Sequence, residues 1–225
     1  MVGAVELTLA SNMTDEDGAL NALLAGYAAG QLPAPLHGLI AAHLMMKPDN
    51  RGFVEAMEVL HSDAIVAAEP APLSRRDEML NRIFAQPVDV PKERISNADD
   101  VVPEPIAAIV GSDLSKLKWR TRLPGLKEYV LKDPSGCEAS LLWIKAGRTM
   151  PSHTHEGTEI TLVLKGAFSD GSQHYARGDI AIADGDVNHR PKADQDEDCI
   201  CFVVNDAPLR LTGPIGRIFQ NFVGY

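Results

Sequence analysis

One stretch of the chain, Gly147–Gly166, constrains the fold more than any other. His153 and His155 are two positions apart, so both side chains leave the same face of an extended strand. Glu159 follows four residues later with the same parity, and it joins them if the strand continues. Two imidazoles and a carboxylate on one face form most of a metal site. We expect the remaining ligand to be His189, thirty residues after Glu159.

A lone histidine on a strand is more often an ordinary polar residue than a ligand. Three ligand-type residues in phase, preceded by Gly and Pro turn signals, instead favour the metal site. Three neutral nitrogens and one carboxylate oxygen suit zinc as a closed site, or iron, manganese or nickel with positions left open.

Size and composition limit the class of protein. The chain has 225 residues, of which 45% are hydrophobic, enough for one large domain or two small ones. No apolar run approaches the roughly 18–20 residues that span a bilayer. The first residues also lack the basic and apolar pattern of a signal peptide, so we expect a cytoplasmic protein that binds no membrane.

The three cysteines, Cys137, Cys199 and Cys201, have no zinc-finger spacing. Cys199 and Cys201 point the same way from a strand, which is a poor geometry for a bond between them. We interpret all three as buried thiols in a reducing compartment, and a redox role stays open.

The net charge of −10 is unevenly distributed. Residues 1–100 contain seven Lys and Arg against fifteen Asp and Glu, whereas the remainder contains fourteen against sixteen. An acidic first half argues against direct nucleic-acid binding, which needs a basic surface to replace counterions. It suits a basic protein partner.

The first half of the chain has helical periodicity. Residues 1–13 carry little periodic signal and are interpreted as a flexible N-terminus. Between residues 14 and 86, apolar residues recur at helical spacing, with Gly and Pro between the periodic segments. The expected helices run from Thr14 to Gly30, from Pro35 to Met46, from Gly52 to Ala67 and from Ser74 to Ala85. They predict a small bundle, or a partly open one that completes its core against a partner.

The second half has β-type spacing. Residues 87–105 are rich in Pro and charge, which is typical of a linker. The expected strands after residue 106 are 128–131, 139–144, 159–165, 179–183, 199–204 and 209–211. Regular strands with frequent turns predict a sandwich or barrel over residues 106–225. The fold class is therefore multidomain, with a helical bundle followed by an all-β domain.

The spacing in the second half resembles the two cupin motifs. The first motif is matched without a missing position by Gly147, His153, His155, Glu159 and Gly166. The segment Gly178–His189 resembles the second, with Asp184 in place of the usual proline. The resemblance implies a jelly-roll barrel that holds one divalent metal ion, with His153, His155, Glu159 and His189 as ligands.

Longer segments are similar to the ChrR-type anti-sigma factors. They are Leu141–Gly147, Glu159–Phe168, Gly178–Asp184, Asp198–Cys201, Asp206–Leu209, Leu23–Gly30 and Leu39–Leu44. In that family a helical domain binds and silences an alternative sigma factor, and the cupin half is needed for the response to singlet oxygen and related oxidants. The resemblance implies that residues 14–86 sequester an ECF-type sigma factor. It also implies that the cupin domain holds zinc and senses an oxidant or a small ligand. No catalytic residue is expected.

One departure from the family concerns a second zinc ion. The family's helical domain usually holds a structural zinc through an early histidine and a His-x3-Cys-x2-Cys stretch. Here His43 stands at the histidine, but Lys47 and Asn50 occupy the cysteine positions, and no histidine lies near Gly18. This set cannot form a tetrahedral zinc site. We therefore expect no metal in the N-terminal domain, and His43 to be a helix-face residue at the edge of the bundle.

The same four cupin residues leave an enzyme open. Iron or manganese with an unfilled position would suit a small-molecule dioxygenase. A third hypothesis is a metal-bearing module that senses a small ligand without chemistry. Glu156, His174 and Tyr175 could line or approach a pocket, although an interpretation as surface residues at strand ends is favoured. No further acid–base constellation names a reaction.

Overall fold

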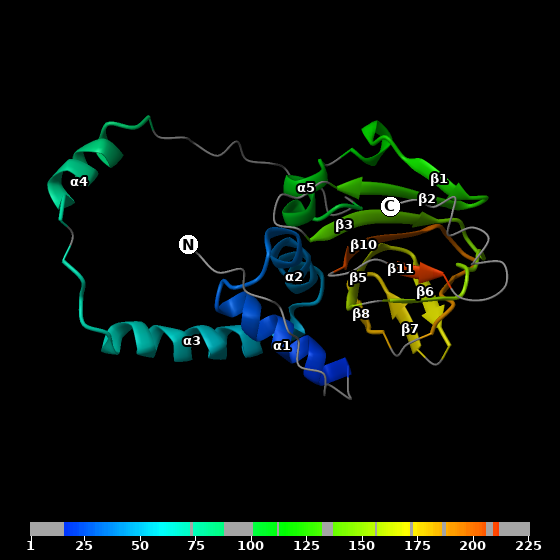
Figure 1. Cartoon of the computed structure of the whole chain (residues 1–225), viewed down its shortest axis with the longest axis horizontal. Helices are drawn as coiled ribbons and strands as arrows, with labels where there is room; N and C mark the ends of the chain where they lie inside the picture. The colour runs from blue at the N-terminus through cyan, green and yellow to red at the C-terminus, as the bar shows by residue number, and fades with distance from the viewer. Residues whose placement is uncertain are drawn as a thin grey trace.

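The computed structural model consists of a β-barrel with helices against one of its faces (Figure 1). The residues it describes are 16–72, 74–87, 101–111, 113–131, 137–155, 157–171, 173–185, 188–205 and 209–211. Helices α1, α2 and α5 lie beside the barrel, whereas α3 and α4 extend away from it (Figure 1). The helical half is thus divided into a docked part and an extended part.

The described residues form five α-helices, and α1 to α4 confirm the four helices that spacing predicted. They are α1 (Glu16–Ala28), α2 (Ala34–Met46), α3 (Arg51–Ala67), α4 (Arg76–Phe84) and α5 (Glu104–Val110), with short 3-10 helices η1 (Pro48–Asn50) and η2 (Leu114–Lys116). Their described ends differ from the predicted ones by at most two residues, and Thr14 lies outside the described residues. Helix α5 was not predicted, because its seven residues are too few for a periodic pattern. It begins inside the segment interpreted as a linker.

Helix α2 is buried on most of its surface. It begins next to Pro33 and Pro35, whose fixed φ suits the first helical turn. Leu39 and other residues around the helix are buried, as expected for a helix that is apolar on all sides. A Cβ at Gly38 would lie only 2.6 Å from Ile109 Cδ1, so the absence of a side chain there allows α5 to approach closely.

The strands form antiparallel sheets. They are β1 (Arg120–Leu123), β2 (Leu126–Leu131), β3 (Glu138–Ile144), β4 (His153–His155), β5 (Glu159–Lys165), β6 (Ala167–Asp170), β7 (Gln173–Ala176), β8 (Ile180–Ala183), β9 (Lys192–Ala193), β10 (Cys199–Asn205) and β11 (Leu209–Leu211). The largest sheet has the order β1-β2-β3-β10-β5-β8, and two smaller sheets have the orders β11-β4 and β7-β6-β9. Every predicted strand appears. Because β4 and β5 belong to different sheets, Glu159 does not join His153 and His155 through one continuous strand, and that part of the expectation is wrong.

Strand parity separates two hydrophobic clusters on the faces of the largest sheet. On β5, Leu162 and Leu164 belong to the cluster that includes α1, α2 and α5, whereas Val163 belongs to the cluster inside the barrel. On β10, Phe202 faces the helices and Cys201 faces the interior. This alternation follows from the two-residue period of a strand. The docked helices therefore share one core with the outer face of the sheet.

The position predicted for His43, at the edge of a helical bundle, is wrong. The side chain is 4% exposed and lies against the barrel. Its Nδ1 is 2.7 Å from the carbonyl oxygen of Gly178, in the turn between β7 and β8. Helical periodicity could not reveal this contact, because it depends on how α2 docks onto a sheet more than 100 residues away in the chain.

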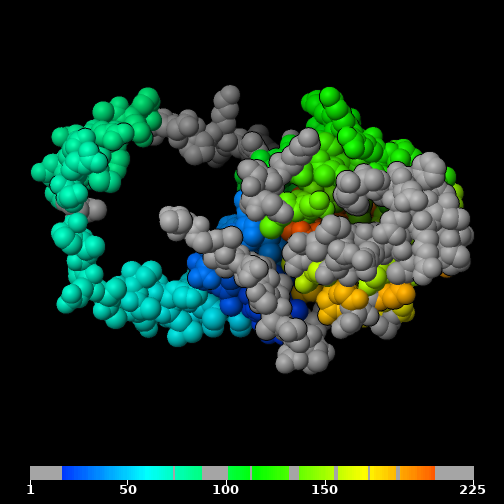
Figure 2. Space-filling view, viewed as in Figure 1, coloured from blue at the N-terminus to red at the C-terminus, as the bar shows by residue number. Residues whose placement is uncertain are grey.

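Helices α3 and α4 leave most of their apolar side chains exposed. The exposed large apolar residues on them are Val59, Leu60, Ile65, Val66, Met79, Ile83 and Phe84. In Figure 2 the two helices form an arm that stands away from the rest of the molecule. None of the helices in the described part of the chain combines the length and apolar character needed to cross a bilayer.

Candidate metal centre

Three of the predicted ligands come from separate elements that meet at one end of the barrel. His153 lies in β4, Glu159 begins β5, and His189 follows β8. A backbone bridge joins the two histidines: the N–H of each donates to the carbonyl of the other, at 3.1 Å and 3.0 Å. This bridge brings together two residues that are 36 positions apart in the sequence.

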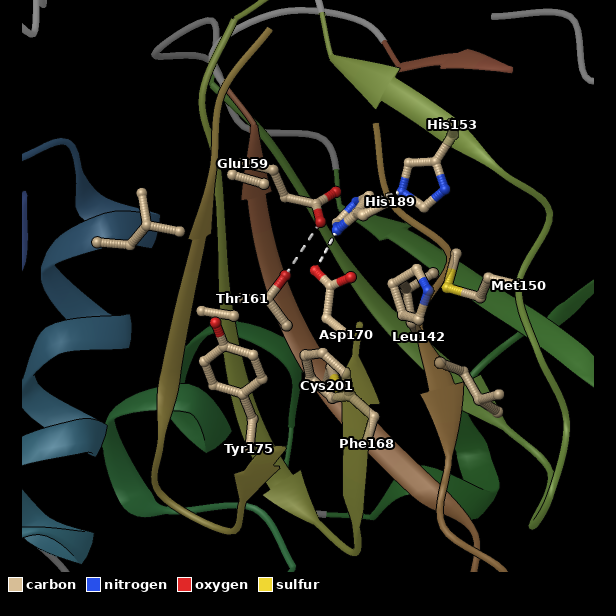
Figure 3. A pocket seen from close by; sticks show the side chains of 15 residues that line it. Leu142, Met150, His153, Glu159, Thr161, Phe168, Asp170, Tyr175, His189 and Cys201 are labelled. Atoms are coloured by element: carbon tan, nitrogen blue, oxygen red, sulfur yellow. Dashed lines mark hydrogen bonds and ion pairs between the residues drawn. The ribbon is translucent and has the colours of Figure 1, made fainter. Parts of the chain in front are cut away.

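The three side chains converge on one point inside the barrel, as Figure 3 shows. One possible ligand atom from each of His153, Glu159 and His189 lies within 4.8 Å of the others, and all three residues are buried. The two Nε2 atoms are 2.8 Å apart. Buried imidazoles and a carboxylate at this separation form a group that could hold a metal ion.

The partners of the two rings determine which nitrogens carry hydrogen. His153 Nδ1 is 2.9 Å from the carbonyl oxygen of Pro151, and His189 Nδ1 is 2.6 Å from Asp170 Oδ2. Because a carbonyl or carboxylate oxygen only accepts, both Nδ1 atoms are donors. In neutral rings both Nε2 lone pairs then point at each other. Two facing acceptors repel, and a cation that binds both would remove the repulsion.

Burial shifts the pKa values of His153 and Glu159. Burial lowers the pKa of His153 to about 4, although its bond to the Pro151 carbonyl raises the pKa. Burial also raises the pKa of Glu159 to about 7, against the lowering effect of its hydrogen bond from Thr161. The surroundings therefore favour a neutral imidazole, which is the form that binds metals. A bound cation would reverse the effect on Glu159 and favour its carboxylate.

The group borders a small, mostly apolar cavity of about 30 Å³. Apart from the three candidate ligands, it is lined by Leu142, Ile144, Met150, Thr161, Phe168, Asp170, Tyr175, Ala181, Ile182, Ala183, Pro191 and Cys201. About 10–15 Å³ of this space is enough to hold one water molecule. The cavity thus offers room for an ion and a ligand of the size of water.

Two thiols lie close to this cavity. The Sγ atoms of Cys199 and Cys201 are 3.6 Å apart, and both side chains are buried. The hydrogen bond with Cys199, together with burial, raises the pKa of Cys201 well above its ordinary value. None of the three cysteines, all within the described residues, forms a disulfide. The predicted burial of Cys199 and Cys201 is confirmed, while Cys137 is half-buried.

The remaining predicted residues have different outcomes. His155 lies in β4, but its side chain and all of Glu156 fall outside the described part of the chain. His174 is exposed, as predicted, and its Nε2 is 2.8 Å from Asp194 Oδ2. The surface position predicted for Tyr175 is wrong, since its ring is buried against Phe168 and lines the cavity.

Asp170 was missed by the reading of the sequence, although it orients His189. It ends β6, next to the positive-φ turn residue Gly171, and the Asp-Gly pair was interpreted only as a turn signal. Thr161 was missed as well. Its parity with Glu159 was the available signal, because residues two apart on a strand share a face.

The sheets and the site define a cupin with a helical N-terminal half, and comparisons with known proteins agree. The family described as "ChrR Cupin-like domain" matches residues 108–208. The anti-sigma-E factor ChrR of Cereibacter sphaeroides is 36% identical over 205 residues, which are 90% of this chain and 95% of that protein. The chain therefore belongs to the ChrR family.

One solved structure supports this assignment. The crystal structure of Rhodobacter sphaeroides SigE in complex with the anti-sigma ChrR matches with a TM-score of 0.71 and 34% identity, over 83% of this chain and 96% of that chain. An RmlC-like cupin from Ralstonia eutropha JMP134 matches with a TM-score of 0.38 and 22% identity, over 46% of this chain and 72% of that chain.

Proposed function

We propose that this protein is an anti-sigma factor that binds an ECF-type sigma factor through its helical half and holds one divalent metal ion in its cupin half. The observation that carries the proposal is the likeness to ChrR, which is 36% identical over nearly its whole length and is described as an anti-sigma factor. A ChrR chain in complex with SigE also matches this chain across both halves.

The exposed arm supports a protein partner. Val66 is 84% exposed and Phe84 is 79% exposed, and both belong to α3 and α4, where the exposed large apolar residues gather. Exposed apolar side chains gathered on neighbouring elements are typical of interaction sites on proteins. An acidic first half suits a partner with a basic surface. Sigma binding would cover this arm and the apolar surface it carries.

The donor set at the end of the barrel suits the proposed metal. His153, Glu159 and His189 supply two nitrogens and an oxygen, and His155 is the fourth proposed ligand from β4. Zinc accepts three nitrogens and one oxygen as a closed site. Such an ion would contribute stability by binding the folded barrel and not the unfolded chain.

The cupin half is the proposed sensor of an oxidant or a small ligand. Its inner face carries the ligands and the Cys199–Cys201 pair, and its outer face packs against α1 and α2. A change inside the barrel can therefore alter the surface on which the docked helices lie. Release of the sigma factor would follow if that surface favours the bound arrangement only in the undisturbed barrel.

The dioxygenase alternative fits the site less well. A substrate must reach the ion together with oxygen, and the cavity of about 30 Å³ has room for a water-sized ligand. The 36% identical relative is described as an anti-sigma factor. Oxygen uptake that is lost in His153→Ala would nevertheless revive the enzyme.

The proposal is tested by co-expressing the full chain with each ECF-type sigma factor of its host. We expect one of them to co-purify as a stable complex with one metal ion per chain. The complex should dissociate on exposure to singlet oxygen or a related oxidant. His153→Ala should alter this oxidant-dependent release of the sigma factor. Failure to bind any of these sigma factors would contradict the proposed function, whereas binding without oxidant sensitivity would contradict only the sensor.

A further inference from the structure

At the end of α2, two polar side chains contact the turn between β7 and β8, and a third, Asn50, bonds one of them. The buried His43 ring lies between this turn and the start of α3. Its Nδ1 is 2.7 Å from the Gly178 carbonyl oxygen, so Nδ1 carries the hydrogen and donates. Its Nε2 is then the acceptor for Asn50 Nδ2, 2.8 Å away. Both ring nitrogens of a neutral His43 therefore have partners.

Lys47 is the other side chain that contacts this turn. Its Nζ is 2.9 Å from Asp179 Oδ1, and the other oxygen of that carboxylate accepts from the backbone N–H of Ala176 at 2.8 Å. Lys47 also contacts the turn along its stem. A Cβ at Gly178 would lie 3.0 Å from both Lys47 Cγ and Met46 Cβ, so the glycine leaves space for the end of the helix.

This constellation stands where the family's pattern has its zinc ligands, and its chemistry does not fit zinc. An ammonium group in an ion pair and a side-chain amide replace the two thiolates. Both nitrogens of His43 are engaged elsewhere, and residues 1–36 contain neither His nor Cys. Within the described residues, His43 is not part of the group that could hold a metal.

We propose that His43, Lys47 and Asn50 form a metal-free clip, here called the α2 clip, which fixes the helical half directly to the barrel. The hydrogen bonds of the clip hold the end of α2 in place, as a bound metal ion would within a helical domain. They also join α2 to the cupin. The clip lies beside β8, which starts at Ile180, and the far end of β8 pairs with Glu159 through Ala183. One strand thus joins the clip to a candidate metal ligand.

The contributions within the clip are unequal. The Lys47 side chain is 41% exposed and that of Asp179 is 33% exposed. Ion pairs as exposed as this one contribute little to stability. His43 is buried with both nitrogens bonded, so removing its partners leaves polar atoms unsatisfied in the core. We therefore assign most of the effect to His43 and Asn50 and a smaller one to Lys47.

The first test is the metal content of the full chain after purification with added zinc. We expect one ion per chain in the wild type and none in the double variant His153→Ala/His189→Ala. An ion that persists in the double variant, and is lost when His43→Gln is added, would overturn the proposal. The result does not depend on sigma binding, so it is separate from the proposed function.

The second test is amide hydrogen exchange in α2 of the full chain. Asn50→Ala removes one hydrogen bond at a half-buried site, so the variant should fold, and we expect exchange in α2 to be about tenfold faster. Lys47→Ala should give a smaller increase. The matched controls are Asn81→Ala on exposed α4 and Lys165→Ala, which breaks the Lys165–Glu197 pair within the cupin.

The control variants should leave exchange in α2 unchanged. Equal exchange rates in Asn50→Ala and Asn81→Ala would overturn the proposal, because the clip would then contribute nothing to docking. Faster exchange over the whole barrel as well as α2 would also contradict it, since the effect would be general destabilisation.

Discussion

The two parts of the helical half show how similar sequence patterns can serve different ends. Helix α2 buries apolar residues on most of its surface between α5 and the barrel, and α1 contributes Leu23 and Leu24 to the same core. Helices α3 and α4 carry apolar residues at the same helical spacing, yet leave them exposed. Amphipathic spacing therefore predicts a helix, but not whether the chain itself or a partner covers it.

The largest expected difference between the two parts concerns stability. Leu39→Ala in α2 creates a cavity in the shared core and should lower the free energy of unfolding by about 2–5 kcal/mol. Val66→Ala in α3 removes an exposed side chain and should change it by less than about 0.5 kcal/mol. Urea denaturation of the full chain measures both. Equal losses would mean that α3 is covered within the free protein.

Sigma binding should have the opposite distribution. Phe84→Asp places a charge in the proposed contact and should weaken binding by at least about 30-fold, as at an interface hot spot. Val130 is an exposed apolar residue on β2 of the cupin, so Val130→Asp is the control and should bind normally. Titration calorimetry with the purified sigma factor measures both affinities. Comparable weakening by the control would move the interface to the barrel.

At the metal centre, Asp170 is expected to hold the ring of His189. Asp170→Asn should lower metal affinity by about 10- to 100-fold, the usual effect of losing a carboxylate partner of a ligating histidine. Asp194→Asn removes a similar carboxylate from the exposed His174 and should leave the affinity unchanged. Competition with a chromogenic chelator gives the two values. A normal affinity in Asp170→Asn would exclude this positioning role.

The smallest expected effect is a pH dependence of the α2 clip. Burial lowers the pKa of His43 below its ordinary 6.5, although the Gly178 carbonyl and Asp179 raise it and Lys47 lowers it. Because the folded protein then binds fewer protons than the unfolded chain, the contribution is present above pH 6.5 and is lost as the pH falls through the folded pKa.

His43→Gln should therefore flatten the loss of stability as the pH falls below 6.5. His37→Gln, an exposed histidine on the same helix, is the control and should keep the wild-type slope. Thermal unfolding at a series of pH values compares the three proteins. An unchanged slope in His43→Gln would indicate that other groups determine the acid sensitivity.

Much of the fold followed from local patterns. The spacing between Gly147 and Gly166 predicted strand β5 and the pairing of His153 with Glu159. Strand parity did not place these two residues together, because β4 and β5 belong to different sheets. The cupin spacing also predicted that His189 would join them. The backbone bridge between His153 and His189, which brings this about, is not visible in any local pattern. The fold class needed only these periodicities and the turns between them.

The features that could not be predicted depend on contacts between distant segments. The burial of His43 requires α2 to dock on the β7–β8 turn, 135 residues further along the chain. Asp170 of β6 meets His189, 19 residues further along the chain, only in the folded barrel. Tyr175 of β7 is likewise buried only once its ring packs against Phe168 beside the cavity. Helix α5 is too short to have a periodic signal, and its position is determined by Gly38 and Ile109.

Amide hydrogen exchange of the full chain, with and without the purified sigma factor, tests the division between docked and partner-binding helices most directly. Addition of the sigma factor should slow amide exchange over residues 51–87, which carry the exposed apolar side chains of α3 and α4. It should change exchange little in the barrel. Slowed exchange in the barrel with no change over residues 51–87 would contradict the account.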